Sequence, residues 1–129
     1  MIRILALAAI NQGVCKIRLN GILGDDIESM IRSLQSIGVN ITKQFDKRVT
    51  IVTIYGVGKD GFSSVKSSVD CGNSGTALRI VMGLISSMRD EITLFGDESL
   101  SKRDNQSMIN SLMDADVFVE KTTDSNLPL

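Results

Sequence analysis

The chain has 129 residues, of which 43% are hydrophobic and 22% are charged, a composition that indicates one folded globular domain rather than a disordered chain. Fourteen Lys and Arg residues nearly balance fifteen Asp and Glu residues, so no overall field attracts nucleic acid or a membrane, and 4% of aromatic residues argue against a base-stacking surface. The sequence has no histidine, which excludes Ser-His-Asp and Cys-His nucleophile systems.

The N-terminal segment and the two cysteines indicate the cellular compartment of the protein and whether it binds zinc. The apolar run 4–10 is too short to span a bilayer, and no convincing signal-peptide cleavage site follows it. Cys15 and Cys71 lie far apart, without histidine partners or disulfide spacing, which argues against zinc and indicates a reducing compartment. We therefore expect a cytoplasmic protein with two ordinary core cysteines and no cofactor.

The first half of the chain predicts two helices and three strands. Residues 2–11 form an apolar helix, residues 14–20 alternate like a strand, and residues 25–37 form an amphipathic helix that opens on an acidic pair. Two further strands are expected at 39–44 and 49–55.

The second half follows a similar order. Strands are expected at 65–71, 91–95 and 116–120, and helices at 75–87 and about 105–113. The shared unit is strand, helix, strand, helix, strand, strand, of which one copy lacks its first strand and the other its last.

This order predicts an α/β fold in which nearly two copies of a β-α-β-α-β-β repeat build a mixed sheet with helices packed on it. The first repeat spans about residues 1–60 and the second about 61–129. Because incomplete repeats leave sheet edges unpaired, we also expect self-association through these edges.

One glycine pattern between the halves resembles a dinucleotide-binding motif. GVGKDG (56–61) matches G-x-G-x-x-G after a predicted strand, but that mechanism requires a helix directly after the glycines. The next segment, FSSVKSSVD, has no helical period. We interpret residues 56–61 as a turn between the repeats and do not expect NAD binding.

A second segment, GNSGTALR (72–79), leads from a predicted strand into a predicted helix. Its two glycines allow a ligand to approach the backbone amides, and Asn73, Ser74 and Thr76 add polar side chains at the positive end of the helix. Arg79 lies on the same helical face as Thr76 and could add a guanidinium. The alternative is a simple helix cap formed by Ser74 or Asn73.

A third segment, GDESLSKRD (96–104), follows the predicted strand 91–95 and carries Lys102 and Arg103. Ligands in α/β proteins gather beyond strand ends, so this loop and the loop at 72–79 could face one crevice. The alternative is a solvated turn in which Asp104 caps the next helix.

Together these segments resemble a known family. GNSGTALRIVMGLIS, followed by LFGDESLSKR, is similar to the GN(S/A)GT-x-x-R and GD-x-S-L-x-x-R-P segments in the N-terminal domain of enolpyruvylshikimate-phosphate (EPSP) synthases. RILALAAINQG, GILGDDIESMIRSLQSIGV and DSNLPL also fit that family, so the resemblance covers essentially the whole chain. UDP-N-acetylglucosamine enolpyruvyl transferases share the repeats but lack the NSGT loop.

The resemblance implies transfer of the enolpyruvyl group of phosphoenolpyruvate to the 5-hydroxyl of shikimate 3-phosphate, a step of aromatic amino-acid biosynthesis, in a cleft between two domains of three repeats each. It assigns phosphoenolpyruvate contacts to the 73–76 loop and to Arg103, and a shikimate 3-phosphate contact to Arg3. The residues of that loop are Asn73, Ser74, Gly75 and Thr76. From their places on the helix face and in the second loop, we also expect supporting roles for Arg79 and Lys102.

The sequence departs from the family pattern at several points. The lysine and serine usually found before Arg3 are missing, Asp104 and Asn105 stand where Pro-Met is usual, and Asp114 replaces a usual glycine. The C-terminal domain and its catalytic residues are also missing. We therefore expect an incomplete N-terminal domain that is inactive alone; the alternative is a non-catalytic binding or assembly module derived from the family.

Overall fold

The computed structural model describes residues 1–63, 65–121 and 126–129. The elements of the first half are α1 (Ile2–Ile10), β1 (Gln12–Asn20), α2 (Asp25–Ser36), β2 (Asn40–Asp46) and β3 (Val49–Val57). Those of the second half are β4 (Ser68–Asp70), α3 (Gly75–Ile85), β5 (Thr93–Phe95), α4 (Glu98–Ser101) and α5 (Gln106–Asp114). Helices and strands are interspersed along the chain, which confirms the predicted α/β class.

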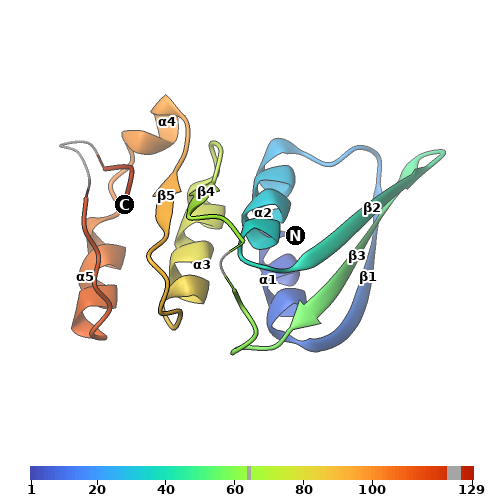
Figure 1. The fold of residues 1–129 in the computed structure, drawn as a ribbon. Helices are drawn as coiled ribbons and strands as arrows, with labels where there is room; N and C mark the ends of the chain where they lie inside the picture. The colour runs from blue at the N-terminus through green and yellow to red at the C-terminus, as the bar shows by residue number, and fades with distance from the viewer. Residues whose placement is uncertain (64, 122–125) are drawn as a thin grey trace.

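The strands form two sheets. β1, β3 and β2 pair antiparallel in that order, and β4 pairs parallel with β5 (Figure 1). Alternate residues of β3 explain how the larger sheet is covered: Thr50, Val52 and Ile54 are buried, whereas their neighbours along the strand are partly exposed. One face of this sheet is therefore packed against helices and the other faces solvent.

The hydrophobic core is continuous between the two halves. Leu5 of α1, Met30 and Leu34 of α2, Leu78 of α3 and Leu100 of α4 are fully buried in one cluster. Figure 1 shows α1 and α2 between the three-stranded sheet and α3, with α4 and α5 beyond β5. The parallel strands thus lie close to the helices of the first half, and α2 packs directly on β4.

The strand predicted at 116–120 is wrong. The chain leaves α5 through a helix-ending turn, in which Asp116 has φ +60° and the Val117 amide donates to the Leu112 carbonyl (3.0 Å). Residues 117–120 then form no strand, and Phe118 is 87% exposed. The alternation in DVFVE is real, but among the described residues it has no neighbouring strand with which to form a ladder.

The glycine pattern at 56–61 forms the end of β3 and a tight turn, in which the Gly61 amide donates to the Gly58 carbonyl (3.2 Å). Along the described part of the chain, the next helix begins only at Gly75. No described helix therefore follows these glycines directly, as dinucleotide binding would require. None of the described helices is long and apolar enough to cross a membrane.

Candidate anion-binding site

The loops that follow β4 and β5 lie side by side because both strands run in the same direction. The Asp97 amide donates to the Gly72 carbonyl (2.9 Å), and the Cys71 amide donates to the Phe95 carbonyl (2.8 Å). The segments at 72–79 and 96–104 therefore meet at the carboxyl end of the parallel pair, as their places after the two strands predict.

Two glycines make this close approach possible. A Cβ on Gly96 would lie 2.5 Å from both the Gly72 carbonyl oxygen and Cδ2 of the buried Leu100. Gly72 has φ +57°, and a Cβ there would lie 2.4 Å from Oγ of Ser29 on α2. Side chains at either position would separate the loops from each other or from α2.

The start of α3 is a capped helix N-terminus. Ser74, which is 2% exposed, accepts a hydrogen bond from the Ala77 amide on its Oγ (3.3 Å). This identifies Ser74 rather than Asn73 as the cap. The amides of Gly75 and Thr76 precede the first intrahelical bonds, so the helix itself offers them no acceptor and its positive end points toward this loop. Capping and anion binding are therefore compatible here.

Two guanidinium groups converge on Gly75. Arg103 donates from Nη2 to Asn73 Oδ1 (2.7 Å), and its Nη1 lies 3.2 Å from the point that a Cβ on Gly75 would occupy. Nη1 of Arg79 lies 3.6 Å from the same point. Among the described residues, neither guanidinium has a carboxylate within ion-pair distance. Two guanidinium groups of like charge thus lie close to the side-chain position of Gly75, an arrangement that favours binding of an anion between them.

The carboxylate of Asp104 does not neutralise Arg103. Its Oδ1 accepts a hydrogen bond from the Gln106 amide (2.8 Å) at the start of α5. The backbone carbonyl of Asp104 instead accepts a hydrogen bond from Nη2 of Arg79 (3.3 Å). The replacement of the usual Pro-Met by Asp-Asn thus leaves the charge of Arg103 available.

Lys102 and Arg3 are not part of this arrangement. Nζ of Lys102 forms an ion pair with Glu98 Oε1 (2.6 Å) one turn earlier along α4, and both side chains are largely exposed. Arg3 is exposed in the first turn of α1, and in the described part of the chain no hydrogen bond or ion pair joins it to the loops. The structure brings together Asn73, Arg79 and Arg103 at Gly75.

The chain matches a protein-family model described as EPSP synthase (3-phosphoshikimate 1-carboxyvinyltransferase) over residues 2–129. The chain belongs to the EPSP synthase family. This confirms the resemblance that the loop sequences carry.

Individual EPSP synthases support the assignment. The chain is 38% identical over 128 residues to the 3-phosphoshikimate 1-carboxyvinyltransferase of Ruthia magnifica, an alignment that covers 98% of this chain and 28% of that protein. It is 35% identical over 109 residues to that of Streptococcus suis, covering 84% of this chain and 25% of that protein. EPSP synthase from Acinetobacter baumannii superposes with a TM-score of 0.82 at 28% identity, over 98% of this chain and 28% of that one. The chain thus spans 25–28% of the length of these relatives.

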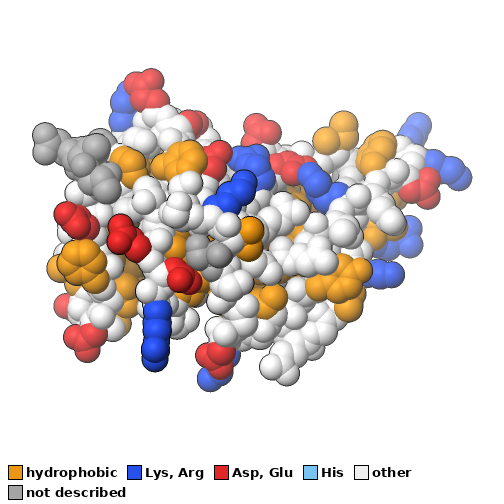
Figure 2. Space-filling view, in the orientation of Figure 1, with side chains coloured by type: hydrophobic (Ala, Val, Ile, Leu, Met, Phe, Trp, Pro, Cys, Tyr) orange, Lys and Arg blue, Asp and Glu red, His pale blue; other side chains and the backbone are white. Residues whose placement is uncertain are grey.

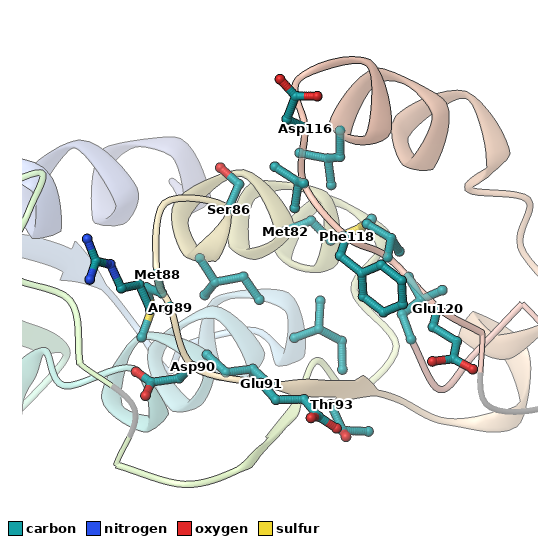
Figure 3. A pocket seen from close by; sticks show the side chains of 17 residues that line it. Met82, Ser86, Met88, Arg89, Asp90, Glu91, Thr93, Asp116, Phe118 and Glu120 are labelled. Carbon is teal, nitrogen blue, oxygen red and sulfur yellow. The ribbon is translucent and has the colours of Figure 1, made fainter.

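Two surface hollows lie elsewhere than these EPSP synthase motifs. One, of about 470 Å³, lies between the end of α3, β5 and residues 116–120 (Figure 3). Four carboxylates, those of Asp90, Glu91, Asp116 and Glu120, line it together with one guanidinium, that of Arg89, and acidic side chains gather over this end of the molecule in Figure 2. Such a rim repels polyanions, so this hollow is a poor match for EPSP synthase substrates.

Sequence reasoning missed the support that α2 gives to the loop. Ser33 donates from Oγ to the Asp70 carbonyl (3.1 Å) and contacts Sγ of Cys71 (3.8 Å), while Ser29 packs against Gly72. The signal was available, because two serines four residues apart lie on one helix face and allow close packing. Burial raises the pKa of the Cys71 thiol to about 11, which makes it a structural group and not a nucleophile.

Proposed function

We propose that this chain supplies one wall of the substrate cleft of an enolpyruvyl transferase, which transfers the enolpyruvyl group of phosphoenolpyruvate to the 5-hydroxyl of shikimate 3-phosphate. The observation that carries the proposal is the convergence of the Arg79 and Arg103 guanidinium groups on Gly75, at the N-terminus of α3, with no carboxylate partner among the described residues. Membership of the EPSP synthase family supports the substrates and the reaction.

The proposed contacts follow the chemistry of phosphoenolpyruvate, which carries both a phosphate and a carboxylate. The polar loop at 73–76 and the guanidinium of Arg103 bind these anionic groups through helix amides and paired N–H donors. Arg3 is assigned to shikimate 3-phosphate, and Arg79 has a supporting role at Gly75. A supporting role for Lys102 would require its side chain to leave the ion pair with Glu98. Because charge develops on the departing phosphate, donors fixed before the reaction stabilise the transition state without reorganising.

We further propose that turnover requires protein beyond these 129 residues, since the relatives are more than three times as long as the segment they share with this chain. On this proposal, the chain is a partial N-terminal domain with repeats at about 1–60 and about 61–129, and it acts in cytoplasmic aromatic amino-acid biosynthesis.

Isothermal titration tests the binding step. Phosphoenolpyruvate should give saturable heat with the chain; Arg103→Ala should abolish this heat, because it removes a guanidinium at Gly75. Arg89→Ala is the matched control, because Arg89 is exposed and lies beyond the opposite end of α3. Saturable binding that survives Arg103→Ala contradicts the proposed site. No binding, together with a stable oligomer, favours the alternative of an assembly module.

A further inference from the structure

We propose that Arg79 is a positioning residue: through the backbone carbonyl of Asp104, it holds the segment that carries Arg103 so that the Arg103 guanidinium faces Gly75. This inference rests on the proposed function, because the substrate contact it serves is that of Arg103. The sequence alone predicts a different role, in which the charge of Arg79 contributes directly to anion binding.

The position of Arg79 on α3 explains its reach. It lies one turn after Gly75, and side chains on a helix lean toward the helix N-terminus, so its guanidinium returns to the level of Gly75. There Nη1 comes within 3.6 Å of the Cβ position of Gly75, while Nη2 donates to the Asp104 carbonyl (3.3 Å). One planar group thus connects the start of α3 to the neighbouring loop.

The segment 102–105 needs such a connection. Its other bonds are internal or local: the Arg103 amide donates to the Leu100 carbonyl (3.1 Å), and Nδ2 of the buried Asn105 donates to the Arg103 carbonyl (3.2 Å). In the described part of the chain, two bonds join this segment to the start of α3 and its loop: the Arg79 bond comes from α3, and the Arg103 bond reaches Asn73 in the loop before it. The Arg79 bond fixes the backbone of the segment at Asp104. The bond from Arg103 to Asn73 can form only when that backbone places the Arg103 side chain within reach.

The acceptor of the Arg79 hydrogen bond is the neutral backbone carbonyl of Asp104, so this bond depends on the direction of the N–H group more than on the charge of the side chain. The Asp104 carboxylate is already bonded to the Gln106 amide, so Arg79 forms no ion pair with it among the described residues. A lysine at position 79 would keep the positive charge, but a single ammonium cannot reproduce the two directions of the guanidinium fork. Charge and positioning can therefore be separated by substitution.

The first experiment measures ¹⁵N relaxation at Nε of Arg103 in the ligand-free chain. Wild type should show an ordered Nε–H, and both Arg79→Gln and Arg79→Lys should lower its order parameter, whereas the matched control Arg89→Gln should leave it unchanged. An Arg103 Nε order parameter that is unaffected by Arg79→Gln overturns the inference. This readout needs no ligand, so its result is separate from that of the proposed function.

The second experiment titrates the same variants with phosphoenolpyruvate. Arg79→Gln and Arg79→Lys should both raise the Kd by about threefold to tenfold, the loss expected when one ordinary, solvent-exposed hydrogen bond is removed. If Arg79→Lys binds as wild type does and Arg79→Gln binds more weakly, Arg79 acts by charge alone and the inference is wrong. If wild type gives no binding, the proposed function fails, and the relaxation experiment still decides the role of Arg79.

Discussion

Gly75, the first residue of α3, and Gly96, in the loop after β5, both belong to the candidate site, but an added Cβ would meet different neighbours at each. A Cβ on Gly75 would meet the ends of two arginine side chains, with the nearest atom, Arg103 Nη1, at 3.2 Å. A Cβ on Gly96 would meet the backbone carbonyl of Gly72 and the buried Leu100 at 2.5 Å. The neighbours of Gly75 are therefore side-chain ends that can move, whereas glycine at position 96 allows two loops to pack.

Alanine substitutions should separate these two cases. Gly96→Ala should lower the free energy of unfolding by about 2 kcal/mol, because buried neighbours must move. Gly75→Ala should change it by less than about 0.5 kcal/mol, because an arginine end can move, while weakening phosphoenolpyruvate binding. Urea unfolding and titration calorimetry measure the two effects.

Gly83 provides the matched control within α3. Nothing lies within 4 Å of a Cβ at this position, so Gly83→Ala should raise stability by about 0.5–1 kcal/mol through helix propensity alone. Equal destabilisation by alanine at positions 75 and 96 would contradict the distinction.

The thiol of Cys71 gives a pH prediction. Burial raises its pKa from 9.0 to about 11 in the folded chain, so both states keep the proton below pH 9 and the full stability is present there. Between pH 9 and 11 the unfolded thiol loses its proton first, and this group should lower the free energy of unfolding by up to about 1.4 kcal/mol per pH unit.

Urea unfolding at a series of pH values, compared between wild type and Cys71→Ala, isolates this contribution from that of other groups. The partly exposed Cys15 gives the control, since Cys15→Ala should retain the fall in stability. Parallel pH profiles for wild type and Cys71→Ala would show that the Cys71 thiol does not carry the effect.

Residue by residue, the sequence predicted part of the site. The approach of Arg103 to Gly75 agrees with the expectation that the two loops could face one crevice, since each follows a predicted strand. The ion pair of Lys102 with Glu98 also follows an ordinary helical spacing, although it was not predicted. The bond from Arg79 to the Asp104 carbonyl could not be predicted, because it depends on the path of a four-residue connection between two helices.

At the scale of elements, α3 is the helix on which the site depends. Its mainly apolar sequence buries one face, but its start is fixed by the single side-chain cap from Ser74. Ser74→Ala should therefore lower the free energy of unfolding by about 1 kcal/mol, since the Ala77 amide loses its acceptor in a buried place. Thermal or urea unfolding followed by circular dichroism measures the change.

Ser86→Ala, at the other end of α3, is a suitable control for the cap. Its hydroxyl donates to the Gly83 carbonyl at an exposed position, so the substitution should stay within about 0.5 kcal/mol of wild type. A larger effect at Ser86 than at Ser74 would mean that the cap does not determine the stability of α3.

Long elements with a clear period were predictable, and short ones were not. The helix at 25–37 has an acidic start and a glycine after its end, and α2 spans Asp25–Ser36. The strands predicted at 65–71 and 91–95 shrink to β4 and β5, three residues each, because strand length depends on the partner. The failure at 116–120 has the same cause, since alternation alone supplies no partner.

At the scale of the whole molecule, the strand order β1-β3-β2 leaves β1 and β2 as edges of the three-stranded sheet. Self-association through such edges stays a prediction, but β1 carries two exposed cations, Lys16 and Arg18, of the kind that discourages edge pairing. The double substitution Lys16→Thr/Arg18→Thr should increase self-association, measured by sedimentation velocity.

The control for this prediction removes the same charge elsewhere. Lys59→Thr/Arg89→Thr changes two exposed cations outside the strands. Equal self-association of both double variants would indicate net charge as the cause, and a strictly monomeric β1 variant would show that the edge is protected in another way.

The hydrogen bond from the Asp97 amide to the Gly72 carbonyl has a practical consequence. It exists only while the two loops are docked, so the rate at which this one proton is replaced by deuterium reports how often the loops separate. Slow exchange of the Asp97 amide proton would mean that the two loops are docked before any substrate binds. The same exchange rate could rank truncations or insertions in either loop by their effect on docking, without an assay of turnover.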